Sequence, residues 1–151
     1  MTKSAEGQKR WQKSLMNNYG TPSLVLAKGK GATLWDVDGK EYVDFLAGIA
    51  VNIVGHAHPY LIEEVTKQMK TLGHTANGAM HLPGLRLAER LLELTGREGK
   101  VFFCNSGTEA NETGIKVARK AGRTGLIALE GSFHGRTMGS LSLTGQPAKQ
   151  D

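Results

Sequence analysis

Ser106, Gly107 and Thr108 form a small polar turn between a short apolar run and a helix-type pattern. The apolar run, residues 101–104, predicts a buried strand, and Ser106 stands three residues before Glu109, which is the spacing of a capping box. A strand that enters a helix through such a turn makes a phosphate cradle, because the first helical N–H groups have no intrahelical partners and the helix dipole favours an anion. Gly107 lets a ligand approach the backbone closely. The same residues also suit an ordinary turn with a good cap, and spacing alone leaves both interpretations open.

A second group of reactive side chains follows the next apolar run, residues 126–129. Residues 108–121, between the two runs, have a helical pattern, so the three elements predict a strand–helix–strand unit of a parallel sheet. Ligands in open α/β sheets collect at the carboxyl ends of the strands, so both loops are expected to converge on one pocket. The second loop supplies an aromatic ring from Phe133, an imidazole from His134 and a guanidinium from Arg136. Without further information, Phe133 suits core packing and Arg136 suits a surface ion pair.

The preceding part of the chain predicts a helix, a small meander and two more helices. The expected first helix is residues 5–17, and the expected strands are residues 24–27, 32–37 and 41–45. Asp38-Gly39 lies between the last two strands and is a strong hairpin signal, because both positions tolerate positive φ. Pro59 and Pro83 suit the first turns of the later helices, which glycines end. Tyr19 follows the first helix, where it either packs or lines a site.

Two histidines, His56 and His58, lie one residue apart. No carboxylate or cysteine stands at ligand spacing, so a structural or helix-entry role is expected and no metal site is assigned.

The composition indicates one globular domain. The chain has 151 residues and a net charge of +5, but no basic run is interleaved with aromatic residues, so no nucleic-acid partner is expected. Its one cysteine, Cys104, lies in an apolar run and is expected to be buried. It has no cysteine partner for an internal disulfide, and the sequence shows no apolar leader and no run that could span a bilayer. A cytoplasmic location is therefore expected.

Five motifs stand out along the chain: residues 36–44 (DVDGKEYVD), 48–51 (GIAV), 55–59 (GHAHP), 105–112 (NSGTEANE) and 131–137 (GSFHGRT). Together they resemble the class III, or ornithine-type, pyridoxal-phosphate aminotransferases, and the acetylornithine enzymes among them most closely. The resemblance implies an α/β fold of the aspartate-aminotransferase-like type, fold type I. Residues 1–50 would be an N-terminal helix and β-meander that belong to the small domain. Residues 51–151 would open the mostly parallel, cofactor-binding large domain and leave it incomplete, so an N-terminal fragment is expected.

The resemblance also implies roles for particular residues. Ser106, Gly107 and Thr108 match positions at the cofactor phosphate, and Phe133 matches the aromatic residue that stacks on the pyridine ring. Arg136 matches a residue that binds a substrate carboxylate, and Tyr19 is placed with the substrate-binding residues. No role is carried over for His134.

The implied activity is transfer of the ω-amino group of N-acetylornithine to 2-oxoglutarate, in arginine biosynthesis, by a homodimer. Ornithine, 4-aminobutyrate and succinyl-diaminopimelate are the alternative donors. The family's cofactor-linking lysine, which forms the Schiff base, and its ring-nitrogen aspartate match no position here, so no catalytic residue is assigned and the isolated chain is expected to be inactive. A non-catalytic anion-binding or interaction fragment is the alternative of another class, since an interrupted sheet exposes strand edges and apolar helix faces.

Overall fold

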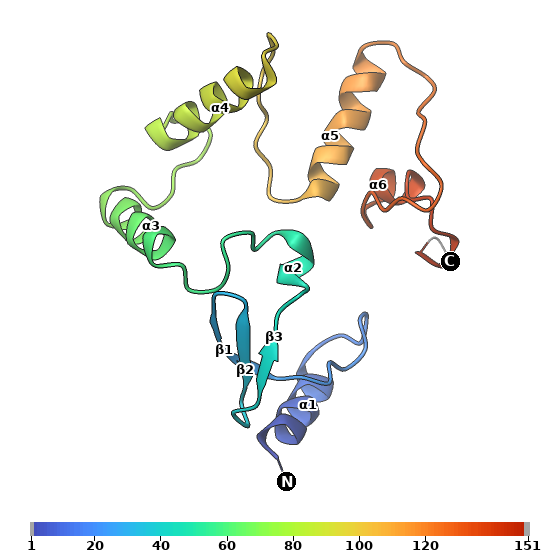
Figure 1. Cartoon of the computed structure of the whole chain (residues 1–151). Helices are drawn as coiled ribbons and strands as arrows, with labels where there is room; N and C mark the ends of the chain where they lie inside the picture. Colours follow the sequence, from blue (N-terminus) through green and yellow to red (C-terminus); the bar gives the residue numbers. More distant parts are fainter. Residues whose placement is uncertain (1, 150–151) are drawn as a thin grey trace. The chain divides into compact units, whose positions relative to one another are not determined.

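The computed structural model describes residues 2–149 and divides into two units, Met1–Ala79 and Met80–Asp151, which are described separately. The first unit contains α1 (Lys3–Ser14), β1 (Leu26–Lys30), β2 (Thr33–Asp36), β3 (Glu41–Val43), α2 (Ala47–Ala50) and α3 (Pro59–Thr71) (Figure 1). The second unit contains α4 (Leu82–Thr95), α5 (Gly107–Lys120), α6 (Met138–Ser142) and a 3-10 turn, η1 (Pro147–Lys149). The expected boundary near residue 50 concerns the domains of the family's fold and stays a prediction.

The strands of the first unit form an antiparallel meander in the order β1-β2-β3 (Figure 1). Asp36 closes the hairpin between β2 and β3, because its Oδ1 accepts from the N–H groups of Asp38 and Lys40, each at 2.9 Å. Gly39 takes a φ of 88° in this turn. The Tyr42 hydroxyl donates to Asp36 Oδ2 at 2.8 Å, and this bond lowers the pKa of Asp36. The hairpin predicted at Asp38-Gly39 is confirmed, whereas the first strand begins at Leu26, two residues later than expected.

The hairpin turn also anchors α1. Asp38 accepts from the N–H groups of Lys3 at 2.9 Å and Ser4 at 3.0 Å. A carboxylate at a helix start satisfies N–H groups that the helix leaves unpaired and interacts favourably with the dipole. The helix ends at Ser14, three residues earlier than predicted.

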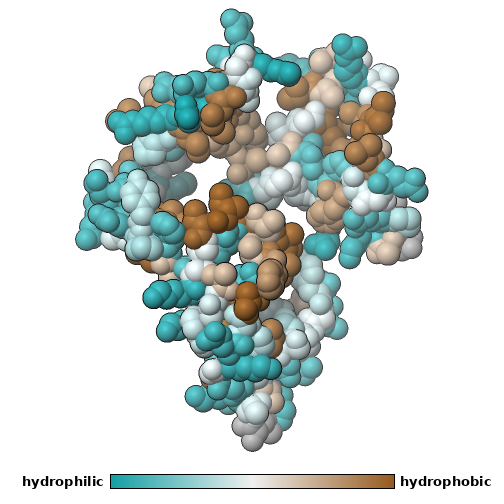
Figure 2. Space-filling view, in the orientation of Figure 1, coloured by the Kyte–Doolittle hydropathy of each residue, from teal (hydrophilic) through white to brown (hydrophobic). Residues whose placement is uncertain are grey.

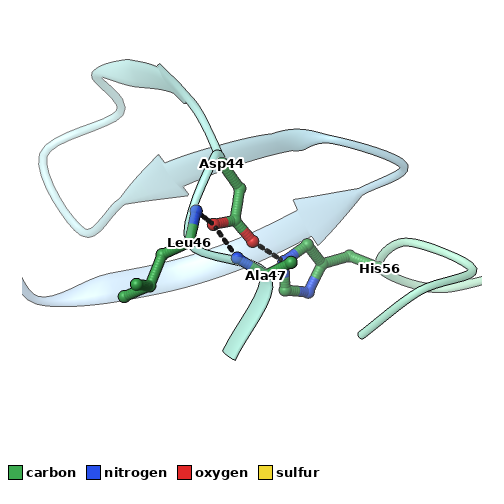
Figure 3. A network of polar contacts seen from close by, with 4 residues as sticks. All are labelled: Asp44, Leu46, Ala47 and His56. Carbon is green, nitrogen blue, oxygen red and sulfur yellow. Dashed lines mark hydrogen bonds and ion pairs between the residues drawn. The ribbon is translucent and has the colours of Figure 1, made fainter. Parts of the chain in front are cut away.

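A short left-handed turn follows the meander. Ala47, Gly48, Ile49 and Ala50 have φ values of 46°, 63°, 65° and 61°. Left-handed helical backbone costs L-residues about 1–2 kcal/mol each, so neighbouring groups must hold this turn. Asp44 does so: its Oδ1 accepts from the N–H groups of Leu46 at 3.0 Å and Ala47 at 2.9 Å (Figure 3). Its Oδ2 lies 2.7 Å from His56 Nε2, so His56 has the structural role expected of it.

Acid should loosen this turn. The hydrogen bond from His56, followed by that from Ala47, lowers the pKa of Asp44 below its ordinary 3.8. A carboxyl with a lowered pKa stabilises the fold fully above the ordinary value, and the stabilisation is lost as the pH falls through the lowered folded value. We expect the Ala47 amide ¹⁵N shift to titrate with a midpoint below 3.8 and Asp44→Ala to abolish that titration. A midpoint at or above 3.8 would contradict this assignment.

The helices α3 and α4 follow their sequence signals. Pro59 occupies the first turn of α3, with His58 at the N-cap position, which confirms the helix-entry role of that residue. Gly96 ends α4 in a left-handed conformation, with φ 62°. At the other end of α4, His81 Nδ1 accepts from the Gly84 N–H at 3.1 Å. Local chemistry therefore sets these boundaries, as predicted. The end of α3 differs from the prediction: the helix stops at Thr71, and its C-cap is Leu72 in an extended conformation.

The expected parallel strands do not form within residues 2–149. Residues 101–104 and 126–129 have no ladder partner there, and β1, β2 and β3 make up the described sheet. A strand exists by pairing, and a parallel strand needs a neighbour brought alongside it by a crossover, so apolar character alone does not create one. Cys104, which was expected to be buried in the first of these strands, is exposed.

Residues 2–149 bury no hydrophobic side chain. The described residues that are buried and polar are Asp36, Ser140 and Thr144, whereas hydrophobic side chains lie open on the surface (Figure 2). Phe45, which directly follows the meander and Asp44, is 95% exposed. Full burial of one such side chain contributes about 1.5–3 kcal/mol, so the described chain lacks the main term that stabilises a domain. Polar contacts hold its local structure instead.

Candidate functional site

The start of α5 carries the predicted cap. Ser106 has an extended backbone at the N-cap position, and its Oγ accepts from the Glu109 N–H at 3.2 Å. The Glu109 carboxylate reaches one residue farther back than in a standard capping box and accepts from the Asn105 N–H at 2.5 Å. The hydroxyl cap is thus confirmed, and the glutamate contact is displaced by one residue. Together they leave the N–H groups of Gly107 and Thr108 at the open end of the helix.

Removing the cap should weaken α5. We expect Ser106→Ala to destabilise the helix by about 1 kcal/mol, because the Glu109 N–H loses its partner, whereas Ser106→Asp should retain it. Amide hydrogen exchange across the first turns of α5 measures the difference. Equal exchange in the wild type and in Ser106→Ala would show that Glu109 alone holds this end.

A closed loop, residues 131–145, carries the second group of side chains. Its ends are joined by hydrogen bonds from the Gly131 N–H to the Gly145 carbonyl at 2.7 Å and from the Gly145 N–H to the Ser132 carbonyl at 2.8 Å. A Cβ on Gly145 would lie 2.6 Å from the Leu129 carbonyl oxygen, which explains why a glycine closes the loop. Compact loops of this length with adjoining ends are Ω-loops, and they frequently carry function.

This loop lies against the first turns of α5. The Asn111 side-chain amide donates to the His134 carbonyl at 2.6 Å, and the Ser140 hydroxyl donates to the Thr108 carbonyl at 2.9 Å. Gly135 lies so close to Thr108 that a Cβ would be 1.6 Å from its hydroxyl oxygen. The loops at residues 105–108 and 132–137 therefore lie side by side, whereas the pocket that they were expected to share stays a prediction.

Thr144 holds the loop from inside. Its side chain is fully buried, and its Oγ1 accepts from the His134 N–H at 3.1 Å. The carbonyls of Gly135 at 3.0 Å and Ser140 at 3.1 Å lie within reach of its proton. One hydroxyl thus fixes the backbone on both sides of the turn that bears Phe133 and Arg136.

The side chains expected to bind ligand lie on the surface of this loop. Phe133 is 50% exposed, so core packing does not describe it within the described chain, and the guanidinium carbon of Arg136 lies 5.2 Å from the centre of its ring. That distance suits a cation–π contact. Tyr19 belongs to the other unit and is 70% exposed, so its place in a site stays a prediction.

The α5 start fits a phosphate group. The Thr108 hydroxyl is buried and makes no hydrogen bond among residues 2–149. An unsatisfied buried polar atom is costly, so a ligand acceptor or donor there would be favourable. Gly107 has no atom within 4 Å of the place its Cβ would occupy, which leaves room for a ligand beside the backbone. Helix-start N–H groups and hydroxyls are the donors that phosphate oxygens prefer.

Comparison with known proteins identifies the family of this chain. Residues 15–151 match the family model described as "Aminotransferase class-III". The chain belongs to the class III aminotransferases. The acetylornithine aminotransferase of Streptomyces coelicolor is 59% identical over 142 residues, which are 94% of this chain and 35% of that protein. The enzyme of the same name from Mycobacterium tuberculosis is 58% identical over 151 residues, 99% of this chain and 38% of its own.

Solved structures give the fold of these class III aminotransferases. Taurine:2-oxoglutarate aminotransferase from Bifidobacterium kashiwanohense, in complex with PLP and glutamate, matches with a TM-score of 0.89 at 27% identity. The matched region is 99% of this chain and 35% of that protein's chain. Acetylornithine aminotransferase from Elizabethkingia anophelis matches with a TM-score of 0.72 at 33% identity, over 80% of this chain and 31% of that protein's chain. The fold is therefore the type I fold of pyridoxal-phosphate enzymes, and pyridoxal phosphate is the family's cofactor. The chain spans about a third of the length of these relatives.

The residues that join the loop to α5 carry little signal in the sequence. Asn111, Glu112, Ser140 and Thr144 have ordinary types at ordinary spacings. The one available signal is periodicity: Asn111 and Glu112 follow Thr108 by three and four residues and so share its face of α5.

Proposed function

We propose that this chain is the cofactor-phosphate and ring-stacking part of an acetylornithine aminotransferase. The observation that supports the proposal is the contact of the residue 131–145 loop, which bears Phe133, with the α5 start, where the Thr108 hydroxyl has no hydrogen-bond partner among residues 2–149. The sequence identity with acetylornithine enzymes supports this donor over ornithine, 4-aminobutyrate and succinyl-diaminopimelate. The complete protein would transfer the ω-amino group of N-acetylornithine to 2-oxoglutarate, in arginine biosynthesis.

Each residue has a physical task in this proposal. Ser106, Gly107 and Thr108 bind the phosphate through hydroxyl and backbone donors, and the helix dipole adds to the attraction. Phe133 orients the pyridine ring by an offset π contact. Arg136, whose guanidinium carbon lies 5.2 Å from the centre of the Phe133 ring, binds a substrate carboxylate through two parallel N–H donors. Tyr19 would line the substrate side. When bound, pyridoxal phosphate supplies the electron sink for amino-group transfer.

The isolated chain should not turn over substrate. Its lysines lie outside any match to the family's cofactor-linking lysine, and no position matches the ring-nitrogen aspartate. With N-acetylornithine, 2-oxoglutarate and pyridoxal phosphate we expect no glutamate, and borohydride should leave only scattered, substoichiometric lysine adducts in a peptide map. Glutamate formation, or a stoichiometric adduct on one lysine, would contradict the claim of inactivity while leaving the phosphate site to its own test.

A homodimer and a cytoplasmic location complete the proposal. The described helices are each too short or too polar to cross a bilayer. The exposed apolar side chains favour a second possibility, an interaction fragment that binds anions without catalysis. The affinities for inorganic phosphate and for a pyridine phosphate ester distinguish these two possibilities. A cofactor half-site should bind the ester clearly more tightly than phosphate, whereas a plain anion site should bind both equally.

A further inference from the structure

Glu112 joins α5 to the start of the neighbouring helix, α6, through its carboxylate. It lies on α5, one turn after Thr108, and is half-buried. Its Oε1 accepts hydrogen bonds from the Thr137 hydroxyl, from the Gly139 N–H at 2.8 Å and from the Ser140 N–H at 3.1 Å. These donors form the start of α6, so a side chain from one helix caps another.

The α6 start is built for this acceptor. Thr137 occupies the N-cap position of α6, yet its hydroxyl makes no cap bond to its own helix and instead donates to Glu112. A Cβ on Gly139 would lie 2.5 Å from Glu112 Oε2 and 2.8 Å from Ile115 Cδ1, so the carboxylate packs closely against the backbone of this glycine. These bonds to Thr137, Ser140 and Gly139 lower the pKa of Glu112, and Lys116 on the same helix favours the charged form.

The loop that bears Phe133 and Arg136 is therefore held to α5 at both ends. Asn111 binds the His134 carbonyl on one side of the turn, and Glu112 binds residues 137–140 on the other. Phe133 and Arg136 extend from this turn, and both side chains are exposed. The hydrogen bonds of Glu112 to Thr137, Gly139 and Ser140 involve neither of these two residues.

We propose that Glu112 is a positioning residue that fixes the Phe133–Arg136 turn relative to the α5 N-terminus and thereby sets the affinity for a pyridine phosphate ester. The inference rests on the proposed function for its ligand. It assigns to Glu112 an effect on binding that is transmitted through the α6 start, without contact between its carboxylate and the ligand.

The test compares Glu112→Ala and Glu112→Gln with Glu89→Ala, a control that removes an exposed carboxylate from α4. Two quantities are measured in the 151-residue chain by NMR: exchange of the Gly139 and Ser140 amides, and affinity for pyridoxine 5′-phosphate, which lacks the aldehyde and so cannot modify lysines. Because hydrogen bonds to a charged acceptor are strong, we expect Glu112→Ala to raise both exchange rates and the dissociation constant by about tenfold or more. Glu112→Gln keeps an acceptor oxygen and should recover most of both, and Glu89→Ala should change neither.

Unchanged exchange in Glu112→Ala would overturn the proposal, and so would faster exchange with unchanged affinity, which would make Glu112 purely structural. Glu112→Ala could also remove the exchange protection of α5 itself, and Glu112→Gln is then compared with the wild type. If Glu112→Gln keeps the protection of α5 but does not restore ligand binding, the positioning role is contradicted. If the wild type does not bind the ester, the proposed function fails and with it the effect on affinity, while the exchange rates still decide whether Glu112 docks the loop.

Discussion

Gly135→Ala should detach the residue 131–145 loop from α5 and abolish binding of a pyridine phosphate ester. The new Cβ would lie 1.6 Å from the Thr108 hydroxyl oxygen and 2.7 Å from Ser140 Cβ, and Gly135 has a φ of 133°. Overpacking and backbone strain each cost about 1–3 kcal/mol. Thr108 and Ser140 both belong to the contact between loop and helix, so relief of the overlap must move the loop. The Ser140 amide, which Glu112 protects, should then exchange freely.

Gly114→Ala is the matched control. Gly114 lies within α5, and no atom stands within 4 Å of the place its Cβ would occupy. Alanine there should stabilise the helix by about 0.5–1 kcal/mol and leave ligand binding unchanged. If Gly135→Ala retained both Ser140 protection and wild-type affinity, the close contact between Gly135 and Thr108 would not exist in solution.

Thr144→Val should have the second-largest effect. Valine matches threonine in shape but lacks the hydroxyl, so the His134 N–H loses its acceptor and the Gly135 and Ser140 carbonyls lose a donor. Each polar group left unsatisfied in a buried place costs about 1–3 kcal/mol. Thr144 is fully buried, and water cannot replace the lost bonds without opening the loop. We expect faster exchange of the His134 amide and weaker ester binding.

Thr144→Ser separates the hydroxyl from the methyl group. Serine keeps the hydrogen bonds and removes only one methyl, which should cost about 1 kcal/mol or less. The predicted order of His134 protection is therefore wild type, then Thr144→Ser, then Thr144→Val. An equal loss in both variants would mean that packing, and not the hydroxyl, holds the turn.

Signals that act between near neighbours in sequence predicted much of the fold. Asp38-Gly39 gave the hairpin, Pro59 opened α3, Gly96 ended α4 and Ser106 capped α5, because each effect needs only a few adjacent residues. The left-handed turn at Ala47–Ala50 could not be predicted in this way. Its residues disfavour that conformation, and the groups that hold it come from Asp44 and the segment up to His56.

Predictions of features that depend on distant partners were wrong, or such features were not predicted at all. Residues 101–104 and 126–129 are apolar enough for strands, but a ladder requires a neighbour, and residues 2–149 supply none to them. Glu112 acts through contacts with residues 25 or more positions away in sequence, and Thr144 through contacts about ten positions away. Their residue types alone do not predict these contacts. The proposed roles of Phe133 and Arg136 came from the family resemblance, since composition favoured packing and an ion pair. Their exposure in the described chain is compatible with those roles.

The most direct test of the central claim is a titration of the ¹⁵N-labelled 151-residue chain with pyridoxine 5′-phosphate and, separately, with unphosphorylated pyridoxine. The Gly107 and Thr108 amides lie at the proposed phosphate cradle, and the Phe133 ring lies in the adjoining loop. We predict saturable shifts of the Gly107, Thr108 and Phe133 amide signals with the phosphate ester and none with pyridoxine at the same concentrations. Equal responses to both compounds, or shifts that spare both Thr108 and Phe133, would contradict the assignment of this site.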